Sequence, residues 1–359
     1  MKKNLRNILT LALGFVTIFA TAQSWDADSR TRVDMGGDND QFTTDQRISL
    51  GASWGGDGWG INVSGNANYT LMEDNGDAPV GFTFNEAYAT TDLMGYASVA
   101  IGRQALEYGG GQLIGANDWA TNPNTRDGGV FSIANDMMDL DLGMYRDNDG
   151  TADDSTGTAA ETTSDYFINA SKSDGDWSVN LTYISKSNED NAMGLDFGYA
   201  MMGGDLDLAV SYNTASVGAT DMDYMSIGGT YNVNDDMSVS ATRTTCGDAD
   251  WGWAGSNYNG ADSWGDNGNM GSLNADEEDM SFGVSYAMGD FTLGLAMHKI
   301  TNGGDGVGAA DYERNVTEAN LGYTMSDNAN VGIKYATDDA GDDVVGDIKY
   351  MWLTLNITP

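Results

Sequence analysis

Residues 59–71 read WGINVSGNANYTL, and every second side chain from Trp59 to Tyr69 is apolar, aromatic or absent. The positions between them hold glycine, asparagine and serine. Because successive side chains of a β-strand point to opposite faces of a sheet, this period of two predicts a strand with one apolar and one polar face.

The same alternation recurs along most of the chain, for example over 206–212 and 291–297. Long strands joined alternately by short turns and longer polar connections are typical of a transmembrane β-barrel. We therefore predict an all-β chain that forms a single antiparallel up-and-down barrel of about eighteen strands. The expected strands are 25–33, 43–54, 59–71, 80–91, 96–105, 128–135, 137–146, 164–173, 176–187, 192–201, 205–215, 222–232, 236–245, 278–287, 290–300, 313–325, 328–338 and 343–357.

The two kinds of connection differ in composition and length. Pairs such as Gly175-Asp176, Gly289-Asp290 and Asp327-Asn328 consist of residues that favour tight turns. The connection between Cys246 and Asp279 is instead roughly thirty residues long. We expect the short turns on one rim of the barrel and the long connections on the other.

The first 22 residues have the features of a secretory signal peptide. Three basic residues precede an apolar stretch over 8–19, and the small residues at 20–22 form a typical cleavage site. The predicted organisation is a signal peptide at 1–22 followed by the barrel at 23–359. This organisation predicts a location in the outer membrane of a Gram-negative bacterium.

The charge of the chain excludes one class of partner. The first 22 residues contain three of the 16 basic residues and none of the 54 acidic ones, so the rest carries a formal net charge of about −41. Nucleic acid is not expected as a partner, because phosphate binding requires a basic surface. Cys246 is the single cysteine, which excludes an internal disulfide.

Aromatic residues mark both ends of the apolar rows. At membrane interfaces such rings form two girdles, although tyrosine and tryptophan are also favoured in strands generally. The short-turn ends hold Trp54, Trp59, Trp177, Tyr199, Tyr231, Tyr286, Phe291 and Tyr323, and the long-connection ends hold Tyr69, Tyr212 and Tyr335.

Four basic residues share the parity of the apolar rows at the long-connection ends: Arg146, Arg243, Lys299 and Lys349. Charge facing hydrocarbon is costly near the membrane midplane but not at the interface. We interpret these residues as contacts to phosphate groups of outer-membrane lipid. The alternative is that they stand above the membrane and keep the rim soluble.

One segment carries a recognisable motif. From Ile101 the chain reads IGRQALEYG, followed by Leu-Ile-Gly at 113–115, Asn-Asp-Trp at 117–119, Arg126 and Phe131. This run of about thirty residues resembles that of the alginate-export-like outer-membrane porins. The resemblance implies a monomeric eighteen-stranded barrel, rather than a trimer, with a lumen narrowed by inward connections and by arginine and lysine side chains.

The predicted pore lining contains both signs of charge. Basic candidates are Arg30, Arg32, Arg47 and Lys334, together with Arg103 and Arg126 from the motif, and acidic candidates include Asp141, Asp196 and Asp207. Arg103 shares the parity of outward Ile101, so its inclusion requires a bulge or a place above the membrane. Inward acids are numerous, and a conduit for polyanionic alginate should be lined with positive charge. A general or cation-preferring pore therefore fits better.

Two long connections carry other candidate sites. Asp147, Asp149, Asp153 and Asp154 surround a glycine in the pattern of a calcium loop without the closing glutamate, so calcium is a possible cofactor and a solvated acidic loop is the alternative. Trp251, Trp253, Tyr258 and Trp264 lie in the other. They could stack on sugar rings, narrow the lumen or form a small core for the connection.

Catalytic chemistry is not indicated. His298 is the single histidine and no serine–histidine–aspartate arrangement is visible around it, so we do not expect an enzyme. The predicted function is passive diffusion of small hydrophilic solutes or ions through a porin. The alternative is a structural or adhesion protein, anchored by the barrel, whose acidic outer loops bind calcium or neighbouring cells.

If hydrocarbon covers the apolar rows, the protein stays in the membrane fraction after washing with alkaline carbonate and is released only by detergent. A secreted β-sandwich, the remaining alternative, would be extracted by the wash. Immunoblotting of the two fractions distinguishes these outcomes.

Overall fold

The computed structural model describes residues 24–36, 42–72, 81–147, 163–186, 189–254, 256–258, 263–302, 313–339 and 348–358. The predicted signal peptide lies outside these residues. The described part of the chain forms one 18-stranded sheet, which confirms the predicted fold class and strand number. Within the described residues, no helix has the length and apolar character needed to span a membrane.

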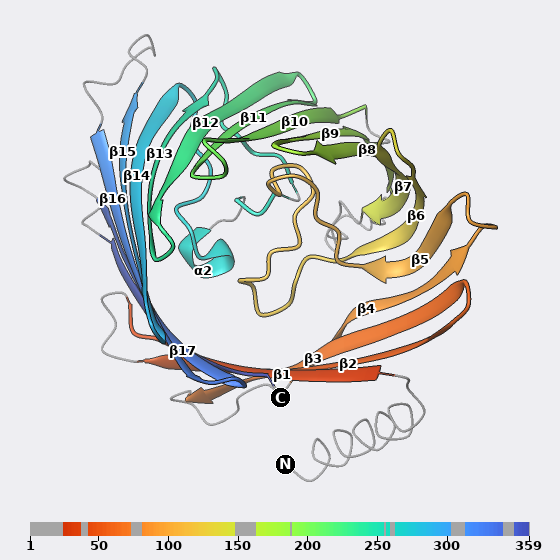
Figure 1. Cartoon of the computed structure of the whole chain (residues 1–359), viewed down its shortest axis with the longest axis horizontal. Coiled ribbons are helices and arrows are strands. Elements are labelled where there is room, and N and C mark those ends of the chain that lie inside the picture. Colours follow the sequence, from red (N-terminus) through yellow and green to blue (C-terminus); the bar gives the residue numbers. More distant parts are fainter. Residues whose placement is uncertain are drawn as a thin grey trace, which may run out of the picture.

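The strands follow one another around a closed ring (Figure 1). Each pairs antiparallel with its neighbours in the chain, and β1 pairs with β18 as well as with β2, which closes the sheet. The strands are Ser24–Asp34 (β1), Thr43–Gly56 (β2), Trp59–Met72 (β3), Gly81–Asp92 (β4), Ser98–Gln104 (β5), Arg126–Ala134 (β6), Asp139–Asp147 (β7), Thr163–Asp174 (β8), Trp177–Ser185 (β9), Asn191–Met201 (β10), Leu206–Val217 (β11), Thr220–Asn234 (β12), Met237–Cys246 (β13), Glu277–Met288 (β14), Phe291–Asn302 (β15), Glu313–Ser326 (β16), Ala329–Asp339 (β17) and Ile348–Ile357 (β18).

The connections do not alternate as strictly as the sequence suggested. β11 and β12 are joined by a turn at 218–219, on the rim that otherwise carries the longer connections. The start of β1 and the end of β18 lie on the opposite rim, since Ser29 pairs with Ile357 and Ser24 with Ser53. An even number of strands produces this arrangement.

The register separates the two faces as predicted. Val210 pairs with Phe197 and Ile227, and all three face outward, whereas the next residue, Ser211, pairs with Asp196 and Ser226 on the inner face. The predicted short-turn aromatics also face outward: Trp59, Trp177, Tyr199, Tyr231, Tyr286, Phe291 and Tyr323 are 36% to 49% exposed. Apolar side chains thus cover the outside of the ring.

The buried apolar cluster lies inside the ring, against the inner face of the barrel. It includes Phe167, Ile184, Ile300 and Val316 from the wall. The partners of these side chains come from two connections that enter the lumen, and α2 (Ser263–Asn267) belongs to one of them (Figure 1).

The substitution Val210→Arg is expected to lower the free energy of unfolding by about 2–4 kcal/mol. This outward position lies between the two aromatic girdles, and we expect hydrocarbon to cover it. Urea titration of protein folded into lipid vesicles measures the change. The matched control is Ser211→Arg, whose side chain enters the lumen beside Asp196. Equal losses in both variants would contradict the assignment of the two faces.

Candidate functional site

Two connections fold into the ring and meet inside it. The first, residues 105–125, joins β5 to β6, and the second, residues 247–276, joins β13 to β14 and contains α2 (Figure 1). Trp253 Nε1 donates to the carbonyl of Leu113 at 3.1 Å, and Trp119 Nε1 donates to that of Gly265 at 3.1 Å. The two connections therefore form one body that narrows the lumen.

Asn257 is the centre of the junction between them. Its backbone N–H donates to Gly111 O at 3.0 Å, its Nδ2 donates to Glu107 at 3.1 Å, and its Oδ1 accepts from the N–H of Asn117 at 2.9 Å. A Cβ at Gly115 would lie 2.0 Å from Asn257 Oδ1, so glycine is required there. The sequence contains no signal for this role of Asn257, because it lies in an irregular segment.

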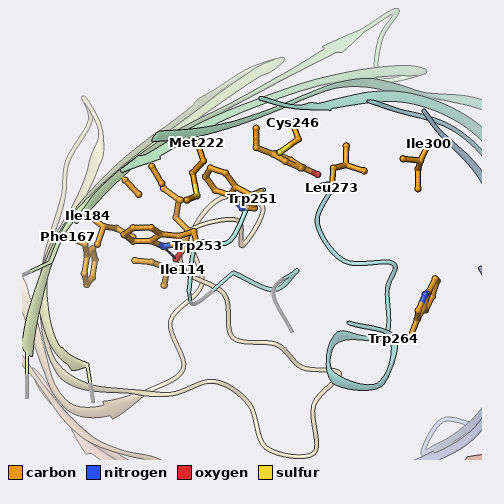
Figure 2. Close-up of a cluster of buried hydrophobic side chains, with 14 of the residues drawn as sticks. Ile114, Phe167, Ile184, Met222, Cys246, Trp251, Trp253, Trp264, Leu273 and Ile300 are labelled. Carbon is orange, nitrogen blue, oxygen red and sulfur yellow. Dashed lines mark hydrogen bonds between the residues drawn. The ribbon is translucent and has the colours of Figure 1, made fainter. Parts of the chain in front are cut away.

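The tryptophans of the second connection are buried. Trp251 and Trp253 are each 1% exposed, and they pack with Ile114, Phe167 and Ile184 against the wall (Figure 2). Trp264 is also buried and donates its Nε1–H to Asp338 at 2.8 Å. Of the three roles considered for these rings, the structure therefore favours a core that attaches the connection inside the lumen, and such rings are not available to stack on a sugar.

Three predicted pore-lining arginines hold the first connection against the opposite wall. Arg30 Nη1 donates to the carbonyls of Asp118 and Trp119 at 3.1 and 3.0 Å, and its Nη2 donates to that of Ala120 at 3.1 Å. Arg32 donates to Trp119 O at 3.1 Å and lies over the indole ring, 3.7 Å from its centroid.

Arg47 completes this contact with a longer bond of 3.4 Å to Ala120 O and an ion pair to Asp28 at 3.6 Å. Irregular backbone in a lumen lacks strand partners for its carbonyl groups, and buried acceptors need donors. The arginines supply these donors, and Arg30 is only 8% exposed as a result.

Lys334 holds the second connection in a similar way. Its ammonium donates to the carbonyl of Gly268 and forms an ion pair with Glu318 at 3.1 Å. Glu318 also lies 3.9 Å from His298 Nε2, and the other ring nitrogen of His298 is 2.7 Å from Asp279. A charged network therefore lines the wall from β14 to β17. The inward parity of Glu318 was visible in the sequence, but its partners were not.

Arg126 and Asp141, both predicted to line the pore, also bind the first connection. Arg126 Nη1 donates to the carbonyls of Leu106 and Gly115, each at 3.3 Å. Asp141 accepts the hydroxyl of Tyr108 at 2.8 Å. Burial and the nearby Asp141 carboxylate raise the pKa of Tyr108, so this hydroxyl stays a donor at neutral pH.

Asp196 and Asp207 lie instead on an open part of the lumen. A cavity of about 640 Å³ extends between the inner faces of β8 to β13 and the two connections. Its lining includes both aspartates, the hydroxyl groups of Ser171, Ser178, Ser211, Ser226, Thr230 and Thr242, and Asn180, Gln112 and Tyr258. No basic side chain is among the described residues that line it.

Tyr258 and Gly109 bring the connections close to these acids. Burial, followed by the charges of Glu107 and Asp196, raises the pKa of Tyr258, so its phenol is neutral at physiological pH. Gly109 has a φ of 57°, and a Cβ there would lie 1.9 Å from Asp196 Oδ2. The glycine of the motif thus allows the backbone to pass directly over the carboxylate.

The prediction for Arg103 was wrong. Arg103 pairs in register with Ala87 and Asp127 and follows the outward parity of Ile101, so it lies outside the lumen. Its Nε and Nη2 donate to the two carboxylate oxygens of Asp127 at 2.6 and 2.8 Å. The register through Gly102 has no bulge that would turn the side chain inward.

The four predicted lipid contacts lie on the outward parity. Arg243 forms a bidentate pair with Glu278 at 2.8 and 2.6 Å, and Lys299 pairs with Glu313 at 2.9 Å. Arg146 and Lys349 pair in register with Asp127 and Thr337. Their contact with lipid stays a prediction.

Most of the proposed calcium loop lies outside the residues that the structure describes. Asp149, Asp153 and Asp154 are outside the described residues, and Asp147 is described only as the last residue of β7. Within the described ranges, no group of three or more acidic, histidine or cysteine side chains could hold a metal ion. Calcium binding therefore stays a prediction.

Replacing Trp253 with alanine is expected to loosen the second connection, because a buried indole and its bond to Leu113 are both lost. Large-to-small changes of this kind cost about 3–5 kcal/mol. Single-channel recording should show a larger and noisier conductance. Trp177→Ala, which removes an outward tryptophan at the short-turn rim, should leave the conductance unchanged. A quiet, wild-type current in the Trp253 variant would contradict the role of this residue.

Comparison with known proteins gives structural similarity alone. No protein-family model and no curated protein matches the sequence. Among solved structures of Pseudomonas aeruginosa proteins, OccK1 (OpdK) matches with a TM-score of 0.72 at 14% identity, covering 93% of this chain and 98% of that chain. OpdO matches with 0.69 at 17% identity, covering 94% and 98%.

The outer membrane protein OprD matches with a TM-score of 0.68 at 14% identity over 95% of each chain. The barrel and its length are thus shared with these proteins from end to end. The more specific resemblance to alginate-export-like porins is not confirmed by these matches. The chain has the closed eighteen-stranded barrel fold of OprD and the Occ proteins.

Proposed function

We propose that this chain is a porin of the Gram-negative outer membrane, through which small hydrophilic solutes or ions diffuse passively, with a preference for cations. The observation that carries the proposal is the 640 Å³ lumen cavity, which has Asp196 and Asp207 in its lining and no basic side chain among its described residues. The apolar outer face and the structural similarity to OprD, an outer membrane protein, support the location.

The distribution of charge inside the barrel supports the preference for cations. Arg30, Arg32 and Arg47 face carbonyl oxygens of the first connection, and Lys334 is paired with Glu318. Arg30 is buried by the connection that it holds, and the side chains of Arg47 and Lys334 are only 18% and 20% exposed. Asp207, in contrast, is exposed to the cavity. Rings of carboxylates favour cations in a pore, so a solute in the cavity experiences a negative field.

Hydroxyl and amide groups give the cavity a second property. Serine, threonine, asparagine and glutamine side chains can replace part of the hydration shell of a neutral or cationic solute. One of the similar structures is described as OpdK with vanillate, which is a small aromatic carboxylate. Asp196 and Asp207 in the cavity wall of this chain favour a cationic solute over such an anion. They also disfavour the polyanion that the alginate-export resemblance implies.

The closed ring of a single chain also supports a monomeric pore. One chain closes its own ring through the pairing of β1 with β18, and both connections that narrow the lumen come from this chain. No partner subunit is required to complete the pore. Chemical cross-linking of the purified protein measures the oligomeric state.

Neutralising the two aspartates together, with Asp196→Asn and Asp207→Asn, is expected to lower the cation-to-anion permeability ratio several-fold. This is the change that follows if a cation in the cavity loses roughly 1 kcal/mol of electrostatic stabilisation. Reversal potentials in planar bilayers under a potassium chloride gradient measure the ratio. The control is Asp235→Asn, an exposed turn residue at the short-turn rim. Electrically silent bilayers with the wild-type protein would instead favour a barrel that serves only as an anchor.

A further inference from the structure

The outer wall of the barrel carries a groove that the channel does not use. It has a volume of about 760 Å³ and lies across β4 to β7 on the outward face. Phe84, Ile101, Gly129 and Met144 line its apolar part. Its other end is formed by Arg103, Asp127 and Arg146, where β5 and β7 approach the long connections.

The groove exists because one outward position has no side chain. Gly129 pairs with Ile101 on one side and Met144 on the other, and these two side chains stand out from the wall, 63% and 46% exposed. Between them the backbone of β6 forms the floor. A side chain is excluded at the preceding residue too, since a Cβ at Gly128 would be 2.0 Å from the carbonyl oxygen of Met144.

The charges at the groove differ from those elsewhere on the outward face. Arg243 and Lys299 each have one carboxylate partner, Glu278 and Glu313. Among the described residues of the groove there are two guanidinium groups and one carboxylate: Asp127 forms an ion pair with Arg103 at 2.6 Å and pairs in register with Arg146. Its mouth therefore carries a net positive charge above an apolar floor.

We propose that the groove binds an acyl chain of a phosphorylated glycolipid of the outer leaflet, with a phosphate of the headgroup on Arg103 and Arg146. This inference rests on the membrane location in the proposed function. The polarity of the groove matches that of the lipid, because an acyl chain gains van der Waals contacts in an apolar slot and a phosphate is bound well by planar guanidinium groups.

The floor of the groove allows a clean test. A Cβ added at Gly129 would meet its nearest atoms, Ala100 O and Ile101 Cγ1, at 3.6 Å, which is an ordinary contact, and the backbone there has no positive φ. Gly129→Leu should therefore fill the slot without disturbing the barrel. Arg146→Gln removes charge from the mouth. Lys172→Gln is the control, because it removes one positive charge from an outward site at the opposite, short-turn rim.

The probe is bisphosphorylated, hexa-acylated lipid A, added to the purified full-length protein in detergent and counted by native mass spectrometry. We expect the wild type and Lys172→Gln to retain one lipid A more tightly than phosphatidylethanolamine or dephosphorylated lipid A. Gly129→Leu and Arg146→Gln should each weaken this retention by roughly tenfold. Heat-modifiable gel mobility confirms that each variant is folded.

Three results would overturn the inference: unchanged retention in the Gly129 variant, equal competition by phosphatidylethanolamine, or a second copy of the chain cross-linked over the groove. Bilayer currents from the same preparations keep the two proposals apart. Conducting channels without lipid selectivity contradict the lipid site alone, whereas a selective lipid site on an electrically silent protein contradicts the channel alone.

Discussion

Pairing of the backbone around a closed ring is the constraint on which the rest of this structure depends. A strand in hydrocarbon has no water for its N–H and C=O groups, so each strand needs a partner on both sides. The antiparallel pairing of β1 with β18 provides the second partner for both the first and the last strand. Once the ring is closed, the alternation of side chains divides every strand into an outer apolar row and an inner polar row.

The two connections inside the ring raise the same question of how their backbone groups are paired. Their backbone is irregular, so its carbonyl groups lack partners in the sheet, and wall residues such as Arg30 and Lys334 provide the donors. Buried tryptophans contribute the apolar part of the attachment. The same cations that would attract anions in an empty barrel are thereby largely covered, and Asp196 and Asp207 remain beside the open cavity.

The wall is not uniform around the ring. On the side of β8 to β13 its inner face borders the hydroxyl-lined cavity, whereas on the side of β4 to β7 its outer face is hollowed at Gly129. Glycines have a part in both features: Gly109 allows the first connection to approach Asp196, and Gly129 leaves space between Ile101 and Met144. One segment of sequence around the motif therefore shapes the lumen and the lipid-facing surface together.

By itself, the sequence determined the fold class, the number of strands and the face on which most strand residues lie. A period of two is a local property, so Val210 and Ser211 could be assigned to opposite faces from their neighbours alone. The sequence could not determine which groups each inward residue contacts. Arg30 binds carbonyl groups 88 to 90 residues away, and Asn257 joins two connections separated by about 140 residues. Arg103 was misplaced because the motif was given more weight than its parity. Only the tertiary structure decided which charged side chains remain open to the lumen. Their exposure depends on where the two connections lie, and irregular backbone has no periodic pattern from which its position could be predicted.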